Sequence, residues 1–364
     1  MTATSAAPGA SSRLLVVRND KLGDFMLAWP ALARLKAASP APHVSVLVPA
    51  YTAPMARLCP WVDRVLVDPG EKADRHERRR LLAEVKAARF DALLTLFSTP
   101  RIGWLGWRAG IPLRLAPATK WAQLFYNRRV VQRRSRSEKP EYRYNIELAE
   151  ALLSELGLAA GTAPEPPWWP LPEGERRAQR QRLAEELALD PARPCVFLHG
   201  GSGGSAVNLA PERYARLVQE VDARLQGARR AQWVLTAGPG EEATAAAIQA
   251  PLREAGIEVH RLPPRAGLDD FARTLAAADL FIAGSTGPLH IAGCLDIATA
   301  GFYPAHRSAT PLRWQTCNRA DHRLAFCPPA SAGEQDMATI DIPAAAVAIS
   351  DLLCRLPAEV TSGS

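Results

Sequence analysis

One carboxylate, Asp24, stands where an apolar segment gives way to a helical pattern. The apolar segment is Leu14 to Val17, and the sequence VRNDKLGDFMLAWPAL continues from it over residues 17–32. After Asp24, apolar residues recur at steps of three and four, which predicts a helix over residues 24–38. A carboxylate at such a junction can cap the helix, or it can project into a site and act as a general base. The residues alone favour the cap.

Two later segments have residues suited to phosphate binding. The sequence HGGSGGSAVNLAPER, residues 199–213, holds four glycines that would let backbone N–H groups approach a ligand closely. The sequence AGSTGPLH, residues 283–290, places Ser285 and Thr286 as caps before a helix that begins near Pro288. Either segment alone is as well explained as an ordinary turn, but the two together in one half of the chain favour phosphate. Neither matches the P-loop or a first-domain G-x-G-x-x-G, which disfavours an ATPase or a dinucleotide dehydrogenase.

The elements that must position these residues are alternating strands and helices on both sides of a proline-rich segment. That segment, residues 158–175, is the predicted linker. Such alternation predicts two doubly wound parallel α/β domains, with ligands at the carboxyl ends of the strands. Predicted strands begin at residues 13, 43, 64, 91, 194, 231, 257, 279 and 297. Predicted helices span residues 24–38, 142–156, 211–225, 241–255, 268–277, 288–294 and 343–356. Pro30 is expected to kink the first of these helices.

Length and composition are those of a two-domain globular protein. The 364 residues are 48% hydrophobic and 22% charged, and no apolar run approaches the ~20 residues of a membrane span. We interpret residues 1–12 as a flexible tail rather than a signal peptide. The six cysteines form no C-x-x-C pair, so a reducing cytoplasm is expected and a zinc site is not.

The net charge of +7 favours an anionic partner. Basic residues gather in residues 71–80, which are best explained as a solvated helix face, and in residues 127–139, where that explanation and anion binding are equally good. No nucleic-acid-binding motif accompanies them, so nucleic acid is not an expected partner.

Three segments in this order resemble a known enzyme family: VRNDKLGDFMLAWPAL, the glycine loop with NLAPERYARL, and STGPLHIAGCLD. Over residues 13–356 the chain resembles the heptosyltransferase-like glycosyltransferases of family 9, which act in lipopolysaccharide assembly. The resemblance implies the GT-B fold, in which two Rossmann-like, doubly wound parallel-sheet domains face each other across a cleft. It also implies inverting transfer of heptose from an ADP-activated donor, in the cytoplasm, without metal or cofactor.

The resemblance also implies the domain roles. We expect an N-terminal acceptor-binding domain at residues 13–165, joined by the C-terminal helix 343–356, and a nucleotide-sugar-binding domain at residues 172–342. The acceptor would be an anionic glycan or glycolipid, and the enzyme could lie on an anionic membrane surface. The expected acceptor-binding residues are Lys21, Arg57, Arg128 and Arg129.

By the same resemblance Asp24 is the general base that takes the proton of the acceptor hydroxyl. Glu241 would hold the donor's ribose, although an acid in the first turn of a helix explains it equally well. Adenine is expected near Leu262. The complete expected donor site is Gly201, Ser202, Ser205, Glu241, Leu262, Ser285, Thr286, Gly287 and His290, with no metal ligand.

One departure from the family pattern concerns phosphate binding. Many members have Lys or Arg in the glycine loop where this chain has Val207, so either Lys21, Arg307 or Arg313 replaces that charge or the backbone amides suffice. Two other functions stay open. One is a different GT-B nucleotide-sugar enzyme such as an epimerase, against which Asp24 on the acceptor side argues. The other is a non-catalytic nucleotide-sugar-binding protein, which only the missing cation supports.

Overall fold

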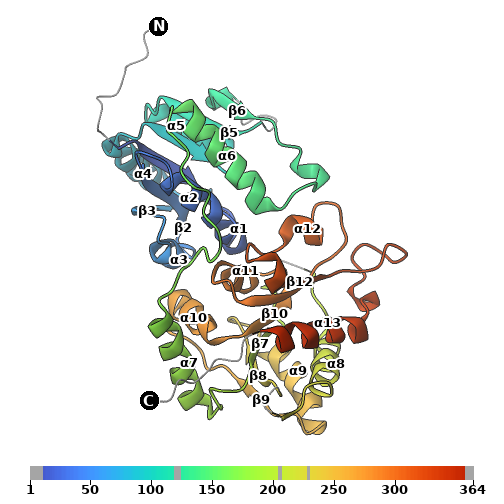
Figure 1. Cartoon of the computed structure of the whole chain (residues 1–364). Helices are drawn as coiled ribbons and strands as arrows, with labels where there is room; N and C mark the ends of the chain where they lie inside the picture. Colours follow the sequence, from blue (N-terminus) through green and yellow to red (C-terminus); the bar gives the residue numbers. More distant parts are fainter. Residues whose placement is uncertain (1–10, 119–123, 204–206, 228–229, 357–364) are drawn as a thin grey trace. The chain divides into compact units, whose positions relative to one another are not determined.

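The computed structural model describes residues 11–118, 124–203, 207–227 and 230–356. The chain divides into two compact units (Figure 1). The first is Met1–Arg134 with Glu141–Glu165, and the second is Ser135–Pro140 with Pro166–Ser364. Within the described ranges, no helix combines the length and the apolar character needed to cross a bilayer.

The first unit is built on a parallel sheet with the strand order β3-β2-β1-β4-β5-β6. Apolar residues of β1 alternate between its two faces, and both sets are buried, as expected for a sheet that helices cover on both sides. The strands are β1 (Arg13–Val17), β2 (His43–Pro49), β3 (Arg64–Asp68), β4 (Ala92–Thr95), β5 (Leu113–Pro117) and β6 (Arg128–Val130).

Helices cover this sheet in two groups. Apolar residues of α4 and α5 share one core with β1, β2 and β4, while α2 packs against α6. The helices are α1 (Leu22–Met26), α2 (Trp29–Lys36), α3 (Ala53–Leu58), α4 (Arg75–Ala88), α5 (Pro100–Arg108) and α6 (Glu141–Glu155).

The predicted helix over residues 24–38 is in fact two helices. The helix is interrupted between α1 and α2. Pro30 therefore lies in the first turn of α2 rather than within a continuous helix. Proline lacks an N–H and is tolerated where that donor has no helical partner, so it starts a helix more readily than it bends one. The break leaves Asp24 on a five-residue helix directly after β1.

The second unit repeats the topology of the first, with the parallel strand order β12-β11-β10-β7-β8-β9. Its strands are β7 (Cys195–His199), β8 (Gln232–Thr236), β9 (Val259–Arg261), β10 (Leu280–Gly284), β11 (Ala298–Phe302) and β12 (Arg323–Phe326). Its helices are α7 (Glu173–Leu187), α8 (Pro211–Asp222), α9 (Glu242–Glu254), α10 (Leu268–Thr274), α11 (Gly287–Cys294), α12 (Pro311–Trp314) and α13 (Ile342–Arg355).

Both sheets have the Rossmann strand order. Numbered within its own sheet, each reads 3-2-1-4-5-6, the order of doubly wound dinucleotide-binding folds. The winding reverses between β1 and β4 in the first sheet and between β7 and β10 in the second. The loops after these four strands are therefore where ligands are expected.

The prediction of the domain against which the C-terminal helix packs was wrong. We predicted that residues 343–356 join the N-terminal domain, but α13 packs against α8 of the second unit. Its buried residues, among them Ile342, Ala345, Ile349 and Leu352, complete the core that covers β7 and β10. Apolar content shows that a helix is buried, but it does not show against which of two similar sheets.

The proline-rich linker is also more ordered than its composition suggests. Trp168 and Trp169 are buried, and both donate hydrogen bonds in the second unit. The indole Nε1 of Trp168 donates to the Cys317 carbonyl oxygen at 2.7 Å, and the backbone N–H of Trp169 donates to the Cys294 carbonyl oxygen at 2.8 Å. The change from one unit to the other falls between Glu165 and Pro166.

Candidate active site

A buried arginine organises the loop after β1, beside the winding reversal of the first sheet. The Arg18 guanidinium, 3% exposed, donates to Asp20 at 2.9 Å, to Asp24 at 2.5 Å and to Glu141 at 3.2 Å. Arg134 donates to the same oxygen of Glu141 at 2.8 Å. The carboxylates of Asp20, Asp24 and Glu141 thus surround one buried guanidinium.

One carboxyl of this cluster has a raised pKa. Burial raises the pKa of Asp20 to about 6, and the nearby Asp24 carboxylate adds to the shift against the opposing effect of Arg18. Asp20 therefore takes up a proton near pH 6.

Asp24 lies in the first turn of α1 but does not cap it. Lys21 is the N-cap residue, and within the described residues no backbone N–H donates to the Asp24 carboxylate. Among the described residues its hydrogen-bond partner is Arg18, and the side chain stays 12% exposed. The carboxylate is thus fixed in orientation by a cation while part of it still reaches solvent.

The four basic residues expected for an acceptor do not gather around Asp24. Lys21 lies three residues before Asp24 and is exposed, and Arg57 is exposed in the last turn of α3. Arg128 and Arg129 lie on the edge strand β6, three strands or about 14 Å from β1 at the usual strand spacing. Arg128 is also paired with Glu155 at 2.6 Å.

In the second unit, Glu241 joins two of the predicted loops. Its carboxylate accepts the backbone N–H of Gly203 at 2.7 Å and that of Gly238 at 2.7 Å. A Cβ at Gly201 would lie 2.0 Å from the Glu241 side chain, so only glycine fits there. Glu241 is the N-cap residue of α9 without capping that helix, and it holds the glycine loop against the loop after β8.

His199 completes this contact at the end of β7. Its Nε2 lies 3.5 Å from a Glu241 oxygen, and its Nδ1 lies 3.0 Å from the Thr236 hydroxyl. Burial lowers the pKa of His199, although Glu241 opposes that shift. The imidazole is therefore a neutral hydrogen-bonding group at neutral pH.

Asn208 is a positioning residue that the sequence interpretation missed. Its amide Nδ2 donates to the carbonyl oxygens of Gly200 and Gly201 at 2.9 and 3.1 Å, and its Oδ1 accepts from the Tyr214 hydroxyl at 2.5 Å. A Cβ on Gly284 would lie 2.4 Å from the same Oδ1. Asn208 thus holds the glycine loop beside the end of β10. In the sequence, Asn208 stands out only as the polar residue directly before LAPER, residues 209–213.

Two buried polar groups at the start of α11, at the same edge of the sheet, have no hydrogen-bond partner among the described residues. Thr286 is the N-cap residue of α11 but makes no capping bond, and its buried Oγ1 is one of these groups. The Nδ1 of buried His290 is the other. Burial lowers the pKa of His290 to about 4, so the ring is neutral. Ser285 and Gly287, on either side of Thr286, are half-buried.

The remaining predicted donor residues are Ser202, Leu262 and Ser205. Ser202 is half-buried in the glycine loop. Leu262 follows β9 at the sheet edge, where its N–H donates to the Leu235 carbonyl oxygen at 2.9 Å. Ser205 lies outside the described residues.

One candidate for the missing phosphate-binding charge lies in the loop after β11. Val207 is 39% exposed and brings no charge to the glycine loop. Arg307 is exposed in the loop that follows β11, the strand next to β10, and no carboxylate in the described part of the chain pairs with it. The carbonyl oxygen of Arg307 accepts the Ser137 hydroxyl at 2.5 Å, which fixes its backbone. Among the described residues, no group of three or more His, Cys, Asp or Glu is arranged to hold a metal ion.

Comparison with known proteins relates this arrangement to one family. The model of glycosyltransferase family 9 (heptosyltransferase) matches residues 78–330. A protein of Haemophilus influenzae named "Putative glycosyltransferase" is 45% identical over 323 residues, which are 89% of this chain and 91% of the relative. Lipopolysaccharide heptosyltransferase 2 of Salmonella typhimurium is 25% identical over 82% of this chain and 85% of its own.

The fold agrees with this assignment. The solved structure of the Escherichia coli ADP-heptose lipopolysaccharide heptosyltransferase II superposes with a TM-score of 0.72 at 20% identity, covering 94% of this chain and 98% of that one. The expectation of two GT-B, Rossmann-like units is confirmed. The family model and the relatives together show that this chain belongs to glycosyltransferase family 9.

Proposed function

We propose that this protein is an inverting glycosyltransferase that moves heptose from ADP-heptose to a lipopolysaccharide core or a related anionic glycan, with Asp24 as the general base. The observation that carries the proposal is the environment of Asp24. Its carboxylate is uncapped, held by a buried arginine and partly exposed at the winding reversal of the first sheet. A carboxylate used only to stabilise its helix would accept backbone N–H groups instead.

The reaction that follows from this geometry is a single displacement. The acceptor hydroxyl transfers its proton to the Asp24 carboxylate while its oxygen forms a bond to the anomeric carbon of the donor. The bond from that carbon to the phosphate oxygen breaks at the same time, and the nucleoside diphosphate leaves with the electron pair. Attack opposite the leaving group inverts the anomeric configuration. The hydrogen bond from Arg18 holds the Asp24 carboxylate in its orientation.

The second unit offers the groups that a leaving diphosphate needs. The start of α11 supplies N–H donors and a positive dipole end, and the unpartnered Thr286 hydroxyl can donate to a phosphate oxygen. The glycine loop, held by Glu241 and Asn208, adds backbone donors. Arg307 is the cation that we assign in place of the charge missing at Val207.

ADP-heptose and a lipopolysaccharide acceptor are supported by the names of the relatives. Heptosyltransferase names recur among them, and the superposed E. coli enzyme is described by its ADP-heptose donor. The net charge of +7 suits an anionic acceptor, and the proposal places the enzyme in the cytoplasm, where the same charge would favour an anionic membrane surface.

The reaction can be tested by titration and product analysis. In calorimetry we expect ADP to bind to the protein and UDP to bind much more weakly. Incubation of ADP-heptose with deacylated lipopolysaccharide core should give ADP and a product whose anomeric configuration, followed by NMR, is inverted. Binding of UDP but not ADP would contradict the donor assignment. Conversion of ADP-heptose to an isomer without acceptor would contradict group transfer.

A further inference from the structure

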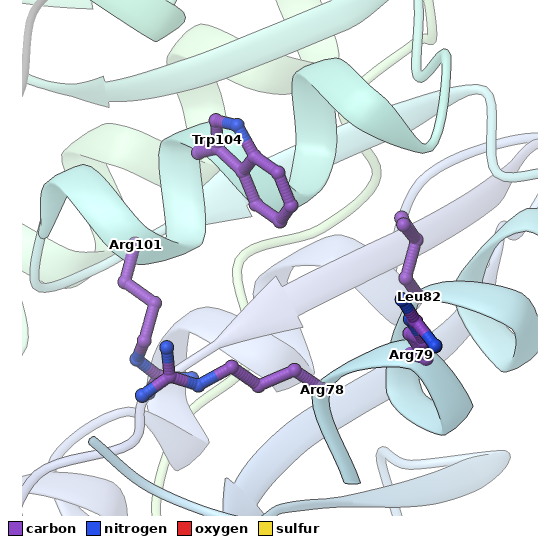
Figure 2. A pocket seen from close by; sticks show the side chains of 5 residues that line it. All are labelled: Arg78, Arg79, Leu82, Arg101 and Trp104. Carbon is purple, nitrogen blue, oxygen red and sulfur yellow. The ribbon is translucent and has the colours of Figure 1, made fainter. Parts of the chain in front are cut away.

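A basic pocket lies between two helices of the first unit, apart from every residue assigned above. Its volume is about 310 Å³, near the lower end of small-molecule pockets, and Arg78, Arg79, Leu82, Arg101 and Trp104 line it (Figure 2). Arg78, Arg79 and Leu82 come from α4, whereas Arg101 and Trp104 come from α5. Figure 2 shows the Arg78 side chain extending from α4 toward Arg101.

Two of the three guanidinium groups in this pocket form no ion pair among the described residues. Arg78 interacts with the Asp74 carboxylate only at longer range, and its Nη2 donates to the Glu71 carbonyl oxygen at 2.7 Å. Arg101, in contrast, is paired with Asp68 through both terminal nitrogens at 2.8 and 2.5 Å. The pocket therefore presents two arginines without a close carboxylate beside one rigidly held guanidinium.

The other wall of the pocket is aromatic and apolar. Trp104 is 42% exposed, and its ring is held by the Arg108 guanidinium carbon 5.8 Å from its centroid. The side chain of Leu82 adds apolar surface. An indole beside guanidinium groups suits a ligand that has both an apolar C–H face and an anionic group, as a phosphorylated or carboxylated sugar has.

A hydrogen-bond chain links this pocket to the loop that carries Asp24. Asp68, at the end of β3, accepts the Arg101 guanidinium and also the Asn19 amide Nδ2 at 2.6 Å. Burial would raise the pKa of Asp68, but the bonds from Arg101 and Asn19 hold it below its usual value, so the carboxylate stays charged. Asn19 stands between Arg18 and Asp20 in sequence. Arg101 and Asn19 are therefore held in fixed geometry on either side of one carboxylate.

We propose that this pocket binds an anionic sugar unit, with its phosphate or carboxylate on Arg78 and Arg101, which converge in Figure 2, its ring against Trp104, and Arg79 adding positive charge on the side of Leu82. The inference rests on the proposed function, because the bound sugar would be part of the glycan acceptor. The pocket then holds a residue of the acceptor at a distance from the reacting hydroxyl, and the Asp68 link keeps the two regions in register.

The test uses the indole N–H signals of the ¹⁵N-labelled full-length protein, with the Trp104 signal identified by its loss in Trp104→Phe. The probes are glucose 6-phosphate, glucuronate and glucose. We expect the Trp104 signal to shift in a saturable way with at least one of the two anionic sugars and not with glucose. Comparison of the two anions distinguishes phosphate from carboxylate recognition.

Matched variants assign the effect to the pocket rather than to net charge. Arg78→Ala with Arg79→Ala should weaken the response about tenfold or more, because charge-assisted hydrogen bonds are lost. Arg80→Ala removes a neighbouring exposed arginine of α4 that does not line the pocket, and it should leave the response unchanged. Trp107→Phe on α5 should identify the indole N–H signal of Trp107, which should not shift when either anionic sugar is added.

Three outcomes would overturn the proposal: no shift of Trp104 with either anionic sugar, an equal shift with glucose, or equal loss of response in Arg80→Ala. ADP titration of the same wild-type sample separates this from the proposed function. ADP binding without a Trp104 response contradicts the pocket alone. A Trp104 response without ADP binding contradicts the ADP donor and leaves the sugar site standing.

Discussion

The buried hydroxyl of Thr286 is a candidate donor to a phosphate oxygen. Its Oγ1 has no hydrogen-bond partner among the described residues, and a buried polar group without a partner costs free energy. Thr286→Val keeps the shape and removes the donor. We expect an unchanged or slightly raised melting temperature and a roughly tenfold or greater loss of ADP affinity by calorimetry. A lowered melting temperature with unchanged ADP affinity would show that the hydroxyl is structural.

Asp20 gives a residue-scale prediction on pH. Its pKa in the folded protein is about 6 against an ordinary value of 3.8, so its contribution to folding stability is full below about pH 4 and is lost as pH rises toward 6. Asp20→Asn removes the buried charge at this position, and its Oδ1 can still accept from Arg18. The variant should therefore gain melting temperature relative to wild type at pH 7.5 and much less at pH 4.5.

Asp63→Asn is the control, because it should change the melting temperature at pH 7.5 in the opposite direction. Despite partial burial, bonds from the Val44 N–H and from Lys36 hold the pKa of Asp63 below its usual value. Its stabilising contribution is present at neutral pH and lost in acid, so this variant should lose melting temperature at pH 7.5. If both variants changed stability in the same direction at pH 7.5, the charge account of the cluster around Arg18 would be wrong.

At the scale of elements, the position of α13 can be tested by one core substitution. Ile349 is fully buried in the core of the second unit, so Ile349→Ala should cost about 2–5 kcal/mol of folding free energy. In calorimetric unfolding, the transition that ADP shifts should move to lower temperature, because both changes act on the second unit. If the ADP-insensitive transition moved instead, α13 would stabilise the first unit.

Elements differed in how far the sequence could predict them. Strands such as β1, β2 and β10 are continuous apolar runs bounded by polar residues, and their predicted starts agree with the structure within about a residue. The strand β6 went unpredicted because three residues, two of them arginine, carry no apolar pattern. The helix α7 is charged on almost every side, so it too lacked a hydrophobic signal.

The candidate site was predictable in part, for a related reason. Motif residues such as Asp24 and Thr286 follow buried strands, and strand ends can be recognised in a sequence. The cluster around Arg18 could not be recognised in that way, because Glu141 is 123 residues from Arg18 in the chain and reaches it only through the packing of α6. The same holds for Asp68 and Arg101.

At the scale of the whole molecule, one chain contains the same strand order twice. Each copy has one winding reversal, and the residues gathered there differ in chemistry. The first copy holds charged carboxylates around a buried arginine, and the second holds backbone amides, neutral imidazoles and an unpaired hydroxyl. This division suits a proton-accepting half and a phosphate-binding half, which is the basis of the proposed transfer.

The most direct test of that account is the turnover of Asp24→Asn, measured with ADP-heptose and acceptor beside ADP affinity and melting temperature. If Asp24 is the base, turnover should fall by about 10² to 10⁴-fold. ADP affinity should stay unchanged, because the phosphate-binding groups belong to the other unit. Asp20→Asn is the matched control, since it also removes a carboxylate from Arg18, and it should keep most of its turnover. Near-normal turnover of Asp24→Asn would contradict the account.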